Sequence, residues 1–471
     1  MMNASIKKFV IFLVLLMSFI TSAAYDIKVD GIYYNVTVGD NPICEVTYGE
    51  ELYSGFINVP MEISYKGRIL PVTGIGSMAF NGCIGLMGIH IPESIKSIGW
   101  RAFDHCSELT IIDLPTSIEL IDGLAFSDCS SLTSVVIPER VTEISLSTFA
   151  GCSSLTEIDI TSNITKIGSS AFEGCNQLRE ISIPSSVIEI GNDAFDGCYN
   201  IHKLNIENAS DNLVLHLEPY NKKTPFGKCL IEEICLGRDI SYMQDQFYGA
   251  QPTSAKGDYT LLLSEFKKNL TKLTIGGSIQ NINLQNGYLN DKFDKLEAVI
   301  ISQSVSTIYD SCFAKCISLR SVSLANSVNY IMNSAFNECP ELMSIMSYNP
   351  EPPQLESNVF TSNTFINGVL YVPGQAIRAY KEADGWKNFW EIKSIDEYTA
   401  GMENIAVCVS PIEIQILNGT VYLYKKSDDA IVRFYTPHGV LIKETTEHEI
   451  QGLPSGLYIV TVDNHSFKVM L

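Results

Sequence analysis

The chain has 471 residues, of which 46% are hydrophobic and 18% are charged, and its formal net charge is −21. A chain this apolar can bury a substantial core, which excludes an intrinsically disordered protein. The negative charge is spread along the sequence and repels phosphate groups, so we expect neither nucleic acid nor an anionic membrane surface as a partner.

The N-terminus has the layout of a cleavable signal peptide. Two basic residues, Lys7 and Lys8, precede the apolar run Phe9–Ile20, and the small residues Ser22–Ala24 follow it. The run is about 12 residues long, shorter than the roughly 20 that a membrane-spanning helix needs. We therefore expect residues 1–24 to be removed during export and the mature chain to have no membrane span.

From Ile75 the sequence repeats with a period of 23 residues. Each of six successive copies carries a phenylalanine, a cysteine three residues later, and a leucine or isoleucine three residues after that. The copies contain Phe80, Cys83 and Leu86; Phe103, Cys106 and Leu109; Phe126, Cys129 and Leu132; Phe149, Cys152 and Leu155; Phe172, Cys175 and Leu178; and Phe195, Cys198 and Ile201.

Each copy ends in a Leu-x-x-Ile-x-Ile stretch, whose alternation predicts a short strand with inward isoleucines. A second apolar pair, such as Val141 and Ile144, then turns the chain back. Weaker copies follow, and the strand leucines or their substitutes indicate about eleven rungs over residues 75–348, with an insertion near 245–256. One coil cannot bury its own apolar face, so the coils must stack into a mainly β repeat solenoid.

Nine of the thirteen cysteines occupy one position of the repeat. Neighbouring strands lie about 4.8 Å apart, whereas the Cβ atoms of a disulfide lie about 3.5–4.5 Å apart. We interpret these cysteines as reduced, small hydrophobic residues of the core. Cys44, Cys235, Cys312 and Cys408 lie off this position, and the alternation around Cys235 predicts an exposed thiol on the binding face.

The repeat resembles that of the BspA-like, or Treponema-type, leucine-rich repeat family of bacterial surface and secreted proteins. The resemblance rests on the Phe, Cys and Leu positions above and implies a leucine-rich repeat solenoid that attaches to a macromolecule. It also implies a strand-rich N-terminal cap over residues 25–74 and a C-terminal cap over residues 349–398. Caps are physically required, because an open end exposes strand edges and apolar side chains.

After Gly401 the period disappears, and residues 399–471 predict six or seven short strands in a small β-sandwich. The last strands, with Gly452–Val460 and Phe467–Leu471, are similar to the sorting domain of the type IX secretion system. The segment Tyr435–Gly439 departs from the turn that such domains usually carry. Two interpretations stay open: a working sorting signal that is removed after export, or a structural end-piece.

The sequence contains no motif that predicts catalysis, a cofactor or a metal ion. Clustered Cys or His ligands for zinc, a phosphate-binding glycine loop and a Gly-x-Ser-x-Gly elbow are all missing. Glu157, Asp159 and Glu180 could imitate the carboxylate pair of a glycosidase, but a solvated acidic face is the stronger interpretation.

A ligand would lie on the outward positions of the strands, which form a continuous surface along a solenoid. The insertion is the second candidate, because long insertions in repeat arrays often carry function. The candidate binding residues are His90, Asp113, Glu157, Asp159, Glu180, Lys203, Phe247, Tyr248 and Tyr259.

The resemblance thus predicts a non-enzymatic protein, secreted or on the outer surface of a Gram-negative bacterium, that binds an extracellular protein or glycan. Two alternatives stay open: a structural coat protein without a specific ligand, and a secreted enzyme or glycan-processing accessory. The ligand and the oligomeric state are not determined by the sequence.

Overall fold

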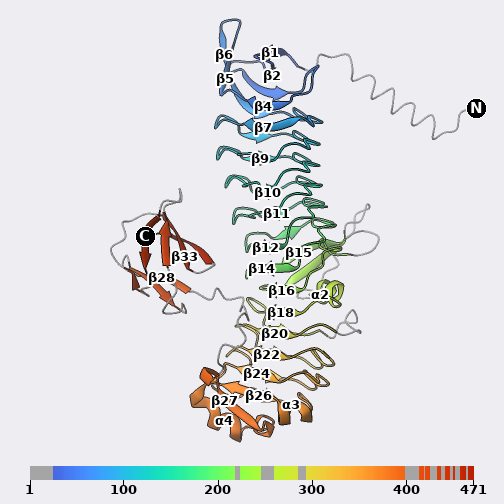
Figure 1. Cartoon of the computed structure of the whole chain (residues 1–471), viewed down its shortest axis with the longest axis vertical. Helices are drawn as coiled ribbons and strands as arrows, with labels where there is room; N and C mark the ends of the chain where they lie inside the picture. The colour runs from blue at the N-terminus through green and yellow to red at the C-terminus, as the bar shows by residue number, and fades with distance from the viewer. Residues whose placement is uncertain are drawn as a thin grey trace, which may run out of the picture.

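The computed structural model describes residues 25–217, 223–244, 259–284 and 293–397, together with strands between residues 413 and 470. The predicted signal peptide at 1–24 and the predicted insertion at 245–256 lie outside the described residues. Figure 1 shows the repeats as one elongated stack of turns, with the N-terminal strands at one end and β26 and β27 at the other.

The Leu-x-x-Ile-x-Ile stretches form a ladder of parallel strands along one side of the stack. Its N-terminal pair is β4 (Gly55–Asn58) and β7 (Leu86–His90), and an isolated bridge joins Ile111 to Ser134 further along. The longest part runs in the order β12 (Glu180–Ile183), β14 (Lys203–Ile206), β16 (Glu233–Leu236), β18 (Lys272–Ile275), β20 (Ala298–Ile301), β22 (Ser321–Leu324), β24 (Ser344–Ser347), β26 (Val369–Val372) and β27 (Glu391–Ser394). We call the outward side of this ladder, from β4 to β27, the strand wall.

The second apolar pair of each repeat also forms strands, although the sequence predicted only a reversal there. These short strands stack in parallel into three further groups. The groups are β6 (Arg68–Ile75), β8 (Ser97–Ile98) and β9 (Leu120–Ile121); β10 (Glu143–Ile144), β11 (Lys166–Ile167), β13 (Glu189–Ile190), β15 (Leu213–Leu217) and β17 (Ile240–Gln244); and β19 (Asn281–Ile282), β21 (Thr307–Ile308), β23 (Tyr330–Ile331) and β25 (Gln354–Leu355).

The repeated phenylalanines form a continuous stack of rings in the core. From Phe80 to Phe226, successive ring centroids lie 5.0 to 5.6 Å apart and the rings are within 11° of parallel. Identical side chains at a fixed period meet in register from turn to turn, so each ring finds the same neighbour above and below. The stack breaks after Phe226 and resumes with Phe313, Phe336 and Phe360.

The repeated cysteines are buried and free, as predicted. The structure adds a role that the hydrophobic interpretation missed, because most of these thiols hydrogen-bond to the preceding turn. The thiols of Cys106, Cys129, Cys152, Cys175 and Cys198 donate, at 3.1 to 3.2 Å, to the carbonyl oxygens of Phe80, Phe103, Phe126, Phe149 and Phe172. The thiol is thus a second donor to a buried carbonyl that also accepts from the backbone N–H of the cysteine three residues later in its own turn.

Aromatic side chains close both ends of the ring stack. At the N-terminus, Tyr53 packs on Phe80 with centroids 4.7 Å apart, among β1 (Ile27–Val29), β2 (Ile32–Thr37), β3 (Ile43–Thr47) and β5 (Glu62–Tyr65). At the C-terminus, Phe360 contacts Trp386 and Phe389. The elements there are α3 (Ser362–Asn367), α4 (Ile377–Glu382) and the short 3-10 helices η2 (Gly374–Ala376), η3 (Trp386–Asn388) and η4 (Ile395–Glu397).

The predicted fold class is confirmed, and the solenoid is somewhat longer than the repeat count suggested. Because β26 and β27 continue the ladder into the segment expected to be a cap, the solenoid has about 13 turns. Beyond it, the described strands of the C-terminal segment form two antiparallel sheets. One contains β28 (Glu413–Leu417), β29 (Thr420–Tyr424) and β32 (Glu449–Ile450), and the other β30 (Val432–Tyr435), β31 (Leu441–Thr445), β33 (Leu457–Val462) and β34 (His465–Met470).

Candidate functional site

The middle of the strand wall carries a row of alternating charges. Side chains alternate between the two faces of a strand, so one outward row passes through equivalent positions of successive turns. The register places Glu180 beside Lys203, Lys203 beside Glu233, and Glu233 beside Lys272. The sequence identified the first two of these residues, whereas Glu233 and Lys272 belong to turns in which the repeat is degenerate.

A shallow groove of about 1430 Å³ follows this part of the wall. Four of the predicted residues line it: Glu157, Asp159, Glu180 and Lys203. Arg179 and His202 also line it, although the sequence analysis did not single them out. A groove that spans several turns fits an extended segment of a macromolecule better than a metabolite, because small-molecule sites are usually enclosed and mostly apolar.

The charged groups in the groove remain available to a partner. Lys203 Nζ lies 3.2 Å from Glu180 Oε2, and Lys272 Nζ lies 3.7 Å from Glu233 Oε2. An ion pair between exposed side chains, such as that of Lys203 and Glu180, contributes only about 0–1 kcal/mol, so a partner can exchange it at little cost. The side chain of Lys272 is only 16% exposed, so its pair is less accessible. Asn205 Nδ2 donates to Ser182 Oγ at 2.8 Å in the neighbouring outward row.

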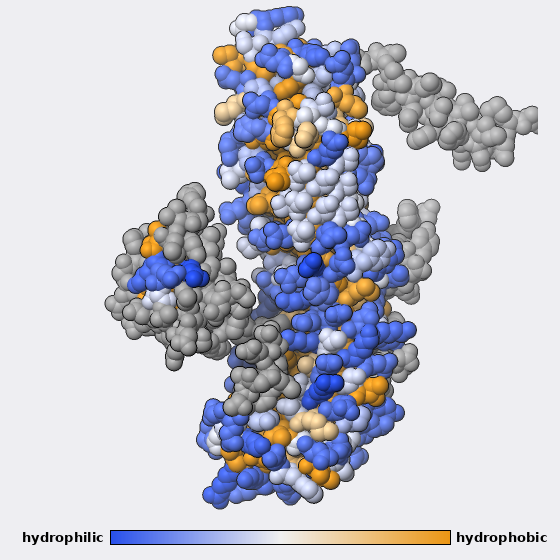
Figure 2. Space-filling view, viewed as in Figure 1, coloured by the Kyte–Doolittle hydropathy of each residue, from blue (hydrophilic) through white to orange (hydrophobic). Residues whose placement is uncertain are grey.

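The N-terminal part of the wall carries three exposed apolar side chains among polar ones. Phe56 on β4 pairs with Gly88, which is equivalent to Ile111 one turn later, so Phe56 and Ile111 lie in the same outward row. Phe56 is 80% exposed, Ile111 58% and Val136 76%. The face of the solenoid that Figure 2 shows is mostly hydrophilic, with scattered hydrophobic residues. The sequence analysis missed Phe56, because β4 precedes the first recognisable copy of the repeat.

The other predicted binding residues lie outside the groove, are buried, or are not among the described residues. His90 and Asp113 are exposed on the N-terminal turns but do not line the groove. Phe247 and Tyr248 lie outside the described residues. Tyr259 was expected on an exposed bulge, but it is 2% exposed, and its hydroxyl hydrogen-bonds to Asn281 O at 3.2 Å.

The burial of Tyr259 follows from a helix that the sequence did not predict. Tyr259 directly precedes α2 (Thr260–Phe266), whose Leu262, Leu263 and Phe266 are buried. The apolar side of this helix fills the core where the ring stack is interrupted, and Tyr259 is drawn into the core with it. Tyr259 therefore does not belong to the candidate surface.

The wall from β18 to β24 differs, because most of its outward side chains are buried. Thr274 is 2% exposed, Ser323 6% and Met346 4%. Cys235 was predicted to be an exposed thiol, but this prediction is wrong, since Cys235 is 9% exposed and disulfide-bonded. The accessible parts of the wall are therefore its N-terminal and central part and, at the far end, β27, where the side chain of Glu391 is 55% exposed.

The acidic residues of the groove do not form a compact trio of ligand atoms in the described part of the chain. Glu157, Asp159 and Glu180 form no close cluster there, since Asp104, His105 and Asp128 are the one described trio of possible metal ligands within 4.8 Å of one another. Within the same residues, no helix combines the length and the apolar character needed to cross a membrane.

Comparison with known proteins gives one family. The family model described as the BspA type leucine rich repeat region matches residues 69–177, 142–215 and 284–373, with six copies, and these ranges together cover half of the chain. No curated protein matches the chain.

Several solved structures are similar to the chain. A leucine-rich repeat protein from Bacteroides ovatus ATCC 8483 is 24% identical, with 79% of this chain and all of that chain covered and a TM-score of 0.40. A leucine rich cell surface protein from Faecalibacterium prausnitzii A2-165 is 21% identical over 79% of this chain and 96% of that one, with a TM-score of 0.36. The T. pallidum leucine rich repeat protein is 28% identical over 39% and 84% of the two chains, with a TM-score of 0.35.

Proposed function

Because the chain belongs to the family of BspA-type leucine-rich repeat proteins, we propose that it is a non-enzymatic binding protein whose strand wall holds an extracellular protein or glycan. The observation that carries this proposal is the set of exposed apolar residues Phe56, Ile111 and Val136 on the same side of the solenoid as the open charged groove, which Val136 also lines. Exposed apolar patches with a polar rim mark interaction sites in otherwise polar surfaces.

The two parts of the surface have complementary tasks in binding. Phe56, Ile111 and Val136 supply apolar area that a partner can desolvate, and a large aromatic side chain is a typical hot spot of an interface. The groove between Glu157 and Lys203 supplies charges of both signs, which orient a partner more than they add affinity. Binding therefore depends on Phe56 for strength and on the charged row for selectivity.

The place of action in this proposal is outside the cell. Residues 1–24 direct export and are removed, and residues 399–471 serve as a sorting domain of the type IX kind. Sequencing the N-terminus of the exported chain tests the first part, with Tyr25 expected as the first residue. Deleting residues 399–471 tests the second, with loss of surface delivery expected in a host that has the exporter.

The binding proposal is tested with the full chain on an array of matrix proteins, mucins and glycans. Val136→Asp and Lys203→Glu each change the wall, and Leu120→Asp is the control, because Leu120 is 45% exposed on the other ladder at β9. We expect a saturable signal that Val136→Asp weakens at least about tenfold, equivalent to about 1.4 kcal/mol, and a changed ranking of ligands for Lys203→Glu, while the control binds normally.

Two outcomes would contradict the proposal. A folded chain that binds nothing on the array supports a coat role instead, and equal binding by all three variants removes the wall as the site. A variant that lacks residues 245–256 separates the wall from the insertion, where Phe247 and Tyr248 remain predicted contacts.

A further inference from the structure

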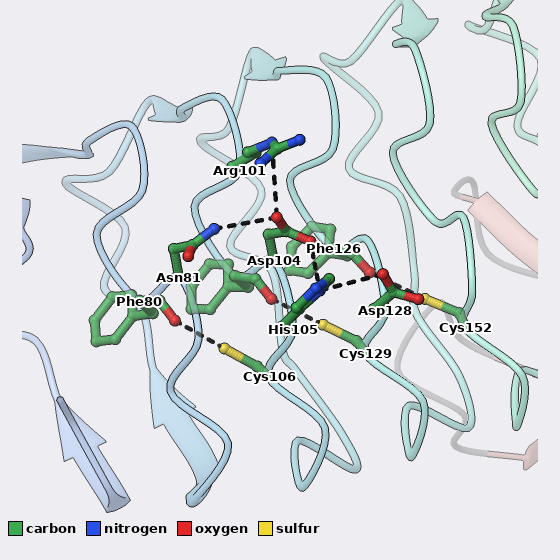
Figure 3. Close-up of polar contacts among 11 residues, drawn as sticks. Phe80, Asn81, Arg101, Asp104, His105, Cys106, Phe126, Asp128, Cys129 and Cys152 are labelled. Atoms are coloured by element: carbon green, nitrogen blue, oxygen red, sulfur yellow. Dashed lines mark hydrogen bonds and ion pairs between the residues drawn. The ribbon is translucent and has the colours of Figure 1, made fainter. Parts of the chain in front are cut away.

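Three side chains that commonly bind metals meet on the turn that carries the phenylalanines and cysteines, outside the groove. His105 Nδ1 lies 3.0 Å from Asp104 Oδ1 and 3.2 Å from Asp128 Oδ2 (Figure 3). Asp128 stands 23 residues after His105, so the period of the solenoid places it directly beside His105 on the next turn. The sequence analysis missed this group, because no ligand motif connects residues 23 apart.

Asp104 has a buried carboxylate, and only one of its two oxygens accepts a hydrogen bond from the protein. The residue is 3% exposed, and its Oδ2 accepts a hydrogen bond from Asn81 Nδ2 at 3.1 Å. Arg101 Nε lies 3.7 Å from the same oxygen. Oδ1, by contrast, has no hydrogen-bond partner among the described residues and points towards His105 in Figure 3. Leaving a buried carboxylate oxygen without a donor is costly, so this oxygen needs a positive partner.

A single imidazole nitrogen cannot satisfy both carboxylates by itself. Nδ1 carries at most one proton, and that proton can point well at one acceptor only. A metal ion that replaces the proton would be bound by all three atoms at once. Zinc bonds to nitrogen and carboxylate oxygen of about 2.0–2.2 Å place neighbouring ligand atoms about 3.0–3.6 Å apart. The two contacts to His105 Nδ1 lie within that range.

The backbone of both outer ligands adopts the left-handed conformation. His105 has a φ of 63° and Asp128 a φ of 54°, whereas glycine occupies the equivalent position at Gly82 and at Gly151. A residue with a side chain costs about 1–2 kcal/mol more than glycine in this conformation. His105 and Asp128 nevertheless occupy this left-handed position in two successive turns.

A pair at the same position lower in the solenoid provides an internal comparison. Lys315 and Glu338 also replace glycine and form an ion pair with Nζ and Oε1 3.7 Å apart. A lysine ammonium has no lone pair for a metal, so this pair is only electrostatic. The upper turns differ in that all three side chains offer donor atoms.

We propose that Asp104, His105 and Asp128 form a site for a divalent transition-metal ion of the zinc type. One imidazole nitrogen with two carboxylate oxygens is a donor set that suits zinc and its neighbours better than calcium or magnesium, which prefer oxygen alone. The side chains of His105 and Asp128 are 61% and 56% exposed, so an ion can enter from solvent. Three protein ligands leave a further position for water.

Such an ion would cross-link two successive turns of the solenoid. Asp104 and His105 belong to one turn and Asp128 to the next, so the ion would bind the folded stack and not the unfolded chain. A ligand of this kind raises the apparent stability in proportion to its concentration.

The test is titration of the full chain with Zn²⁺ by isothermal calorimetry, with a thermal unfolding scan alongside. We expect one equivalent to bind and to raise the Tm, and His105→Gln or Asp128→Asn to weaken binding at least about tenfold. His202→Gln is the matched control, because His202 is also exposed but lies in the groove.

The absence of saturable Zn²⁺ binding to the wild-type chain would overturn the proposal. Equal binding by the wild-type chain and both ligand variants would overturn it as well, and so would loss of binding in the His202 control. Both substituted side chains are exposed, so circular dichroism should report an intact fold. If one variant unfolds, the other carries the test.

Discussion

The turns between residues 75 and 206 repeat one arrangement, whereas those between residues 223 and 301 reach the same stacking by several different contacts. In the first region every interface contains parallel phenylalanine rings and a thiol-to-carbonyl hydrogen bond. In the second region the ring stack is interrupted and α2 fills the core instead. A solenoid therefore tolerates loss of its consensus where local contacts replace the missing neighbour.

A buried arginine is the clearest of these replacements. Arg238 is fully buried, and its guanidinium donates to Pro184 O at 2.9 Å and to Ser185 O at 3.1 Å. Burial lowers the pKa of Arg238, because the guanidinium charge is held away from water. The side chain reaches carbonyl groups more than 50 residues earlier and ties the irregular turns to the last regular ones.

The strongest test of the regular region is Phe149→Ala, in the middle of the ring stack. Phe149 is 1% exposed and stacks on Phe126 and Phe172. We expect a loss of about 3–5 kcal/mol in the free energy of unfolding, measured with urea, because the cavity lies between two rigid neighbours. The control is Phe56→Ala, whose exposed ring should change stability by less than about 0.5 kcal/mol. Equal effects would mean that the stack does not hold the turns.

Gly277 tests the irregular region at its tightest contact. It has a φ of 65°, and a Cβ there would lie 1.7 Å from the carbonyl oxygen of Gly237. Gly82 has a similar φ of 70° but open space around it. We expect Gly277→Ala to cost about 3 kcal/mol, because backbone must move, and Gly82→Ala only about 1 kcal/mol. Similar losses in chemical denaturation would show that the irregular turns are loosely packed.

The thiol hydrogen bond can be separated from the volume that the cysteine fills. Cys152→Ala removes both, and Cys152→Val keeps most of the volume without the donor to Phe126 O. We expect the valine variant to lose about 0.5–1.5 kcal/mol and the alanine variant more, because the thiol hydrogen bond is lost although Phe126 O still accepts from Cys129 N at 3.3 Å. A valine variant as stable as the wild type would show that the thiol only fills space.

Thiol chemistry provides a further check on the same residue. Burial raises the pKa of Cys152 to about 12, so almost none of it is thiolate at neutral pH. Since the thiolate is the reactive form, a thiol reagent should label Cys152 only as the chain unfolds.

The smallest expected effect concerns the pH dependence of the irregular region. Burial raises the pKa of Glu265 above its usual value of 4.5, although Thr224 donates to both carboxylate oxygens at 2.7 and 2.6 Å. A carboxyl group with a raised folded pKa binds its proton more tightly in the folded state, so stability is highest below pH 4.5 and falls as pH rises through the folded pKa. Glu265→Gln should remove this fall, which Tm measurements across that range would detect. A difference in Tm between Glu265→Gln and the wild type that stays the same at all pH values would contradict this prediction.

The sequence predicted the core of the molecule correctly, but it predicted the exposure of surface residues less well. The Phe, Cys and Leu positions identified both the fold and the buried side chains, including the free thiols. The same alternation misplaced Cys235, and proximity to an insertion misplaced Tyr259. Both errors concern exposure, which depends on what else in the chain packs against a residue. The cluster of Asp104, His105 and Asp128 escaped notice for a related reason, because its contacts cross from one turn to the next.

The sequence by itself determined the period, the fold class and the composition of the core. A side chain that returns every 23 residues has only one way to be buried, which is to meet its own copy in the adjacent turn. The tertiary structure alone decided which outward residues stay accessible, how α2 and Arg238 fill the irregular turns, and where Asp128 meets His105. Those outcomes depend on contacts between segments far apart in the chain, and local periodicity carries no information about them.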